Sequence, residues 1–352
     1  MKKMTFMLLF LFFVSEQALA LSDIEITGEA DLNGVGFILP SGQAGHTEFQ
    51  VQSLLLDFSI PLKEGNLLYV SLEGAQKRTN TGESFLVNTR EAYLDLVNVF
   101  EGMHGLRLGL IPHSWLEAQY EDWDYRFLGQ MGWSISEKWG YSSYSDLGVS
   151  FMSELPASLG EWAISVVNGE GRDQDKAGPH KEGSLFFRFT TWAPWLISLN
   201  YVHGTYEQYG SEVAAKERIQ ASVVYKPEEQ NYKIGLELLD AHDPADAITD
   251  GKMADAVGVI NLTGQAVHGF GGSLYTVFST GPKAEVMVRY DYLNAVVGDP
   301  DKTLQSGVVA LGYQLTEDIK AALAVDHTLY GEGYGPGVRD TSKVELAAQV
   351  LF

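Results

Sequence analysis

Four carboxylates lie close together in the segment SWLEAQYEDWDYR, at Glu117, Glu121, Asp122 and Asp124, and Arg126 follows them. Carboxylates at this density attract cations, and opposite a basic surface they create a field that discriminates among ions. Tryptophan and tyrosine residues stand between these charges. Because such large side chains are usually buried, we interpret the segment as an ordered element. Its carboxylates would attract or discriminate among ions.

Single arginines stand between apolar residues elsewhere in the chain, as in LRL at Arg107, FRF at Arg188 and VRY at Arg289. In a strand, side chains alternate between two faces, so each such arginine would lie on the face opposite its apolar neighbours. The basic candidates for this face are Lys77, Arg107, Arg188, Arg218, Lys233 and Arg289, and the acidic ones include Glu29, Asp31, Asp57, Glu73, Asp95, Glu237, Glu285, Asp291 and Asp326.

Two arrangements of these arginines are consistent with the sequence. In the first, Arg107, Arg188 and Arg289 lie on a wall facing the acidic segment and produce a transverse field across a constriction. In the second, each arginine forms a structural ion pair with a neighbouring inward carboxylate, as Arg289 would with Asp291 or Glu285. The sequence favours neither arrangement.

Other kinds of chemistry have weaker support. The chain has no cysteine, which excludes disulfides, thiolate metal ligands and cysteine nucleophiles. In LLDAHDPADAITDG, His242 and Asp243, together with Asp240, Asp246 and Asp250, could bind a cation through oxygen ligands, although a solvated acidic loop is the simpler interpretation. No two of the eight histidines are spaced as in a metal-binding motif: His46, His104, His113, His180, His203, His242, His268 and His327. We expect no enzymatic activity and no cofactor.

The elements that would position these side chains are strands. The chain ends in VELAAQVLF, where Val344, Leu346, Ala348 and Val350 alternate with more polar residues, and this period of two recurs along the chain. About sixteen such segments begin near residues 22, 48, 66, 86, 104, 146, 160, 183, 195, 216, 231, 267, 283, 304, 318 and 342. Their lengths, near ten residues, and their even number predict an all-β, transmembrane antiparallel β-barrel.

The connections between these segments alternate between short turns and long loops, which is the layout of an outer-membrane barrel. The stretch 112–145 is then the third external loop. We expect it to fold into the barrel as a constriction, with SWLEAQYEDW forming a short helix. In a closed barrel the last strand pairs with the first, so Phe352 would lie in the lower aromatic girdle.

The N-terminus has the order of a cleavable secretory signal: Lys2 and Lys3, an apolar run, then Ala18-Leu19-Ala20. We therefore expect a signal peptide over 1–20 and the barrel over 21–352. The net charge of −22 argues against nucleic acid as a partner. We expect the partners to be outer-membrane lipid and lipopolysaccharide, small solutes and ions, and the barrel assembly machinery, which would recognise the strand ending in Phe352.

Several segments resemble the porin O/P family, the phosphate-selective type of outer-membrane porin: REAYLDL (90–96), GLRLGLIP (105–112), SDLGVSF (145–151) and ALGYQLTEDIKAALAVDH (310–327). The resemblance covers most of the chain beyond residue 20. It implies a sixteen-stranded, trimeric channel in the bacterial outer membrane with its third loop folded inward. Phosphate selection in that family depends on many inward basic residues, whereas the candidate inward positions here are of mixed charge.

We therefore expect a porin for passive diffusion of small hydrophilic solutes and ions with a weak preference for cations. The alternatives are a phosphate-selective or anion-selective porin, and a surface adhesin or receptor that uses the barrel as an anchor. The residues expected to line the pore or its constriction are Arg107, Glu117, Glu121, Asp122, Asp124, Arg126, Arg188, Arg218 and Arg289. The residues expected to face lipid are Leu56, Leu106, Phe187, Val288 and Leu346.

Overall fold

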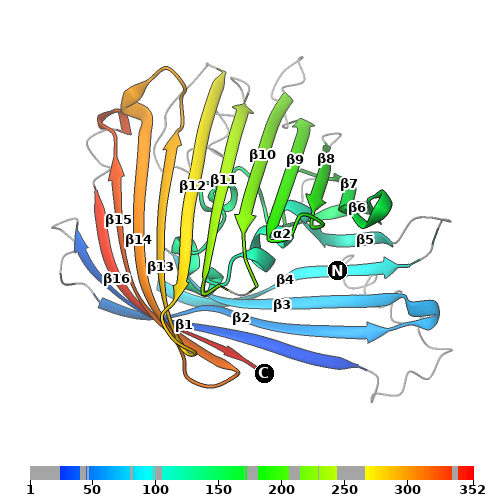
Figure 1. The fold of residues 1–352 in the computed structure, drawn as a ribbon, viewed down its shortest axis with the longest axis horizontal. Coiled ribbons are helices and arrows are strands. Elements are labelled where there is room, and N and C mark those ends of the chain that lie inside the picture. Colours follow the sequence, from blue (N-terminus) through cyan, green and yellow to red (C-terminus); the bar gives the residue numbers. More distant parts are fainter. Residues whose placement is uncertain are drawn as a thin grey trace.

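The computed structural model is a single closed barrel of antiparallel strands (Figure 1). It describes residues 24–39, 45, 47–79, 82–97, 99, 105–169, 171–172, 181–205, 215–228, 230–243, 266–334 and 340–352. The predicted signal peptide, Asp246 and Asp250 lie outside these residues, and so does the side chain of Lys77.

Each strand pairs with its neighbours in sequence, and β1 closes the barrel by pairing with β16. The strands are β1 (Glu25–Leu39), β2 (Thr47–Pro61), β3 (Leu67–Thr79), β4 (Gly82–Leu96), β5 (Gly105–Pro112), β6 (Ser145–Glu154), β7 (Gly160–Val167), β8 (Glu182–Phe189), β9 (Trp195–Thr205), β10 (Ala215–Tyr225), β11 (Tyr232–Asp243), β12 (Val267–Ser279), β13 (Ala284–Asn294), β14 (Thr303–Gln314), β15 (Ile319–Tyr330) and β16 (Thr341–Leu351). The predicted barrel is confirmed, and every predicted strand start falls within four residues of the observed one.

The described helices are short, and none is long and apolar enough to span a bilayer. Three of them lie between β5 and β6 and are drawn inside the barrel in Figure 1: α2 (Ser114–Asp122), η3 (Arg126–Met131) and α3 (Ile135–Lys138). The predicted short helix at SWLEAQYEDW is thus confirmed as α2. The remaining 3-10 turns lie between strands: η2 (Lys63–Gly65), η4 (Pro156–Ser158), η5 (Pro300–Lys302) and η6 (Glu332–Tyr334).

The outer face of the barrel is apolar, as the period of two predicts. Val288 and Leu346 are 42% and 60% exposed, although both are aliphatic. Leu56, Leu106 and Phe187 share this outward register, because their neighbours in the strand point inward. A continuous exposed apolar surface is unfavourable in water and favourable in a lipid bilayer.

Aromatic side chains form a row on the outer face at the end of the barrel that carries the short turns. Ring contacts run from Trp195 to Tyr225, then to Tyr232 and Phe278, with centroids 4.6 to 6.0 Å apart. Phe352 lies at the same end, where its backbone exchanges hydrogen bonds of 2.8 and 3.0 Å with Gly28. A Cβ on residue 28 would lie 2.4 Å from the Phe352 ring and 2.9 Å from the carbonyl oxygen of Leu55, so a larger residue there would displace the ring. The last residue is therefore paired in the barrel and belongs to this aromatic girdle.

Candidate functional site

The segment 113–144, called here the crossing loop, leaves β5 and passes through the interior of the barrel before it enters β6 (Figure 1). Its first helix, α2, contacts β8 and β9. The next turn, η3, contacts β15, β16, β1 and β2, and α3 then contacts β11 and β12. Because these strands lie on different sides of the barrel, the loop crosses the lumen.

The middle of the crossing loop is held by an apolar cluster, called here the aromatic core. Trp123 packs edge-on against Tyr275 of β12 at 4.2 Å between ring centroids, and Tyr125 stacks on Phe127 at 5.7 Å. A Cβ on Gly235 would lie 2.0 Å from the Tyr275 ring, so this glycine makes room for the ring that supports Trp123. The members of the core are Trp123, Tyr125, Phe127, Leu128, Met131, Val224, Tyr275, Val277, Met287, Val308, Ala310, Ala322, Ala324 and Ala347.

The wall beneath the aromatic core consists of small or flexible apolar residues that point inward. Ala310, Ala322 and Ala324 are at most 2% exposed, and Met287 is fully buried. Small side chains at these positions leave space for the three aromatic rings of the loop. The alternating pattern did not predict this wall, because a period of two assigns the apolar residues of a strand to the outer face. The available signal was that both registers of AALAV and GVVALG are apolar, which indicates a strand buried on both faces.

Smaller contacts hold the two ends of the crossing loop. Trp115 and Leu116 of α2 are fully buried and pack with Ala163 of β7 and Phe186 of β8. At the other end, Ile135 of α3 belongs to a cluster of residues from β11 to β14 and the turns next to them. The loop is therefore fixed along its length by burial of apolar surface.

The opposite side of α2 is charged and contacts arginines of the barrel wall. The Arg107 guanidinium lies 3.2 Å from Asp95 of β4 and 2.9 Å from Glu117 of the loop. The Arg188 guanidinium pairs with Asp122 at 2.9 Å and also with Glu121. The two arrangements left open by the sequence are combined here. Each arginine contacts an acid of the loop and also a carboxylate of the wall, Arg107 with Asp95 and Arg188 with Glu161 of β7 at 3.6 Å.

Arg289 is held by a carboxylate of its own strand rather than by the loop acids. Its Nε lies 2.6 Å from Oδ1 of Asp291, and both side chains are at most 2% exposed. The guanidinium also lies 5.6 Å from the Trp123 ring and donates to the carbonyl oxygen of Met131 at 3.4 Å. Of the two arrangements left open by the sequence, the local ion pair with Asp291 is the one observed for this arginine. Arg289 is therefore part of the support of the aromatic core.

The two other arginines expected to line the pore have different surroundings. Arg218 of β10 pairs with Asp243 of β11 at 2.6 Å and donates to the carbonyl oxygen of His242 at 3.0 Å. Arg126 lies over the rings of Tyr120 and Tyr144, 4.6 and 5.0 Å from their centroids. Both cations are thus fixed by neighbours, Arg218 in the wall and Arg126 inside the loop.

Asp124 forms a further tie between the loop and the wall. Its Oδ2 accepts a hydrogen bond of 2.8 Å from the Lys233 ammonium, which also donates to the carbonyl oxygen of Asp122 at 2.6 Å. Burial raises the pKa of Asp124, but the nearby Lys233 charge lowers it, and the net pKa lies below the usual value. Asp124 is therefore ionised at neutral pH.

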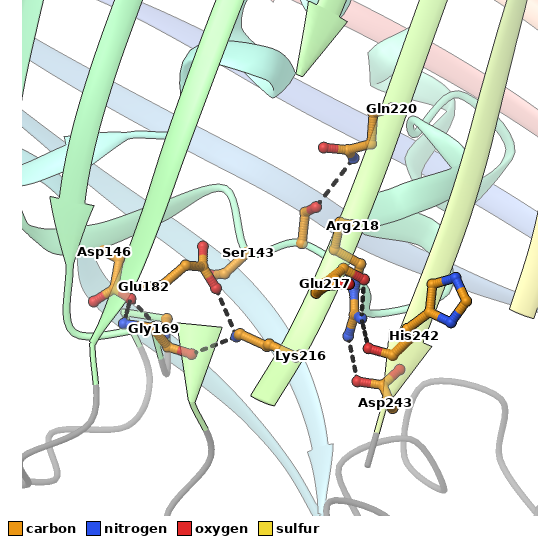
Figure 2. A network of polar contacts seen from close by, with 12 residues as sticks. Ser143, Asp146, Gly169, Glu182, Lys216, Glu217, Arg218, Gln220, His242 and Asp243 are labelled. Atoms are coloured by element: carbon orange, nitrogen blue, oxygen red, sulfur yellow. Dashed lines mark hydrogen bonds and ion pairs between the residues drawn. The ribbon is translucent and has the colours of Figure 1, made fainter. Parts of the chain in front are cut away.

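A polar network occupies the end of the lumen that carries the long loops, where β10 meets the crossing loop (Figure 2). Lys216 of β10 pairs with Glu182 of β8 at 2.6 Å, and Gln220 donates to Ser142 at 3.3 Å. Asp146 of β6 accepts from the backbone N–H groups of Gly169 and Gly171 at 2.6 and 3.1 Å. The network borders a small cavity of about 110 Å³ in which basic and acidic side chains balance.

Larger cavities lie on both sides of the crossing loop. One of about 530 Å³ is bordered by Leu128 and Met131, and another of about 870 Å³ is bordered by Asp124 and Val277. A third cavity, of about 340 Å³, lies beside α2 and is called here the acidic cavity. Its charged lining residues are Asp95, Arg107, Glu117, Glu121, Glu154, Glu161 and Arg188. Five carboxylates against two guanidinium groups give this lining a formal charge of −3.

Solved structures match this barrel over nearly its whole length. The outer-membrane channel DcaP of Acinetobacter baumannii has a TM-score of 0.69 at 10% identity, covering 94% of this chain and 97% of that one. The anion-selective porin of Comamonas acidovorans has a TM-score of 0.67 at 14% identity, covering 94% and 99%. The fold is that of the bacterial outer-membrane porins.

A third porin of this fold, OmpT of Vibrio cholerae, has a TM-score of 0.59 at 12% identity and covers 96% of this chain and 100% of that one. No protein-family model and no curated protein matches the sequence. The porin fold is therefore shared with proteins that are only 10 to 14% identical to this chain, and solute preference has to be inferred from the residues of this chain.

Proposed function

We propose that this protein is an outer-membrane porin that lets small hydrophilic solutes and ions diffuse through its lumen, with a weak preference for cations. In this proposal the protein is a passive channel and not an enzyme. The apolar outer face and the girdle of aromatic residues support a location in the bacterial outer membrane, where a closed barrel leaves no strand edge unpaired.

The observation that carries the cation preference is the composition of the acidic cavity. Its two arginines are each within 3.2 Å of carboxylates, so their charge is compensated locally. The remaining carboxylates leave the lining with a formal charge of −3. A cation entering this space is attracted and an anion is repelled.

The position of the aromatic core favours a path for solutes along the charged side of the loop. Fourteen buried apolar residues fill the space between η3 and the wall from β10 to β16, and water and ions are excluded from such a close-packed cluster. The acidic cavity beside α2 is the space next to the loop that is lined by its carboxylates, and solutes would pass there. The loop acts as the constriction, and α2 presents its carboxylates to the path.

Selectivity for anions is the alternative raised by one structural neighbour, whose name describes it as anion-selective. The lumen of this chain argues against carrying that property over, because Arg107, Arg188, Arg218 and Arg289 all form ion pairs with carboxylates. A trimeric assembly is proposed by analogy, since one structure of the neighbour OmpT is described as a trimer form.

The test is a planar-bilayer recording of the purified, folded barrel. Stepwise increases in current are expected, and a gradient of potassium chloride should give a reversal potential of the sign for potassium. The preference should grow as the salt is diluted, because at about 0.15 M charges beyond roughly 8 Å are screened.

Two results of this recording would contradict the proposal. Absence of any step in current, with the barrel shown to be folded by its gel mobility before and after boiling, would favour a surface adhesin or receptor. A chloride-selective current that phosphate blocks would favour the phosphate-selective alternative.

A further inference from the structure

Two histidines and one aspartate meet on the outer face of the barrel, away from the lumen. Asp240 and His242 belong to β11, and His268 of β12 is the direct register partner of His242. In both strands these residues alternate with buried ones, so their side chains point outward. They stand at the ends of the two strands that face the long connection between β11 and β12.

The three side chains converge on one point. The imidazole rings stack with centroids 4.0 Å apart and an angle of 10° between their planes. Nε2 of His242 lies 2.9 Å from Oδ1 of Asp240, and Nε2 of His268 lies 2.8 Å from Oδ2 of the same carboxylate. Two nitrogen donors and one carboxylate thus lie within 4.8 Å of one another.

We propose that Asp240, His242 and His268 bind one divalent transition-metal ion of the zinc class. Zinc bonds to histidine nitrogen at about 2.0–2.1 Å and to carboxylate oxygen at about 2.0–2.2 Å, so tetrahedral ligand atoms lie about 3.3 Å apart. The observed Nε2–carboxylate distances are already close to this value. Small side-chain rotations would bring the three donors around an ion in place of the present hydrogen bonds.

The donor types select the class of metal. Imidazole nitrogen suits zinc, copper and nickel, whereas calcium and magnesium are bound by oxygen ligands. Three protein ligands leave a fourth position of a tetrahedral zinc ion for water. With neutral imidazoles the site carries the single negative charge of Asp240, and the chain as a whole carries −22, so both attract cations.

The site is accessible. Its ligands differ from those of the cation site that the sequence suggested. The side chains of Asp240, His242 and His268 are 30%, 51% and 39% exposed. The adjacent Asp243 points to the other side of the sheet, where it pairs with Arg218 at 2.6 Å (Figure 2). The third ligand instead comes from β12, at a position 26 residues after His242, which no local spacing rule could have indicated.

Two other outward histidines provide matched controls. His203 of β9 faces Glu217 of β10 at 3.4 Å, and His327 of β15 forms a hydrogen bond of 2.6 Å with Ser342 of β16. Each lies on the outer face like His242, but neither belongs to the one group of potential metal ligands found among the described residues. Substituting them removes an exposed imidazole and leaves the proposed site intact.

The experiment uses the full barrel in detergent and titrates it with zinc chloride by calorimetry and with cobalt chloride by visible absorption. We expect one ion per chain, with a cobalt spectrum typical of mixed nitrogen and oxygen ligands. His242→Ala and His268→Ala should each weaken binding at least about tenfold, and the double variant should abolish it. His203→Ala and His327→Ala should bind as the wild type does.

Either of two outcomes would overturn the proposal. One is a wild-type barrel that binds no zinc and gives no cobalt spectrum, a measurement that depends on no variant. The other is a double variant, shown to be folded by gel mobility, that retains wild-type affinity, because the ion would then bind elsewhere. Channel recordings do not enter this test, so its result is independent of the proposed porin function.

Discussion

The two sides of the crossing loop differ in almost every respect. On the side of η3, Trp123, Tyr125 and Phe127 are buried against alanine, valine and methionine of the wall. On the side of α2, carboxylates meet Arg107 and Arg188 around a cavity of about 340 Å³. The two sides therefore have different roles. Apolar packing fixes where the loop lies, and the charged side determines what passes beside it.

This difference in role has an energetic reason. Burial of aromatic side chains stabilises a fixed position strongly and without regard to salt. Partly exposed ion pairs such as that of Arg188 with Glu121, whose side chain is 60% exposed, contribute little to stability but still shape the local potential. Substitutions on the side of η3 and substitutions on the side of α2 should therefore have different effects on the protein.

The largest effect is expected from Trp123→Ala, which removes the ring that packs on Tyr275. Loss of a buried tryptophan costs about 3–5 kcal/mol, and here the cost should appear as release of the loop from the wall because the strand pairing is unchanged. Single-channel conductance should rise severalfold and become noisy. The matched control is Trp192→Ala, an exposed tryptophan in the turn between β8 and β9 whose ring stacks on Phe189. Unchanged conductance in Trp123→Ala would show that the aromatic core does not hold the constriction.

An intermediate effect is expected from overpacking the wall with Ala324→Leu. Ala324 is fully buried beneath the aromatic core, and extra methylene groups in a close-packed core cost about 1–3 kcal/mol. The neighbouring Val325→Leu lies on the outer face at 45% exposure and should leave the urea unfolding midpoint within experimental error. Equal midpoints for the two variants would mean that the inner wall is not close-packed.

A small effect is expected from Asp124→Asn, which removes the carboxylate partner of Lys233. Because the pKa of Asp124 is lower in the folded protein than its ordinary value, the pair stabilises the fold above the unfolded-state pKa near 3.9 and loses this contribution as the pH falls through the folded-state pKa. The side chain is 52% exposed, so the difference from the wild type should be under about 1 kcal/mol at pH 7. This difference in stability should vanish in strong acid. A difference that grew in acid would show that folding raises the pKa of Asp124 and does not lower it.

The strands could be predicted from the sequence because a period of two assigns each side chain to a face without knowledge of its partner. The pairing of the last strand with the first followed from the same pattern and the even number of strands, although its register, with Phe352 opposite Gly28, did not. The short helix α2 was also predictable, since it is a local element.

What could not be predicted was which distant side chains meet. The local sequence around Trp123 does not indicate that its ring rests on Tyr275, because that contact depends on the path of the loop through the lumen. In the same way, His242 and His268 come together only through the register of β11 with β12. The contact between Arg188 and Asp122 was expected only as a longer-range attraction, since the width of the remaining gap depends on packing elsewhere.

The reversal potential of a variant that neutralises the charged side is the most direct test of the account. Glu117, Glu121, Asp122 and Asp124 are replaced together by their amides, and the exposed turn residues Glu317 and Asp318 are replaced by theirs as a control that makes the same kind of substitution at two sites away from the loop. In a dilute potassium chloride gradient, the account predicts that the fourfold variant shifts its reversal potential toward that of chloride while the control remains cation-preferring like the wild type. An unchanged reversal potential in a folded fourfold variant would contradict the claim that this face of the loop sets the selectivity.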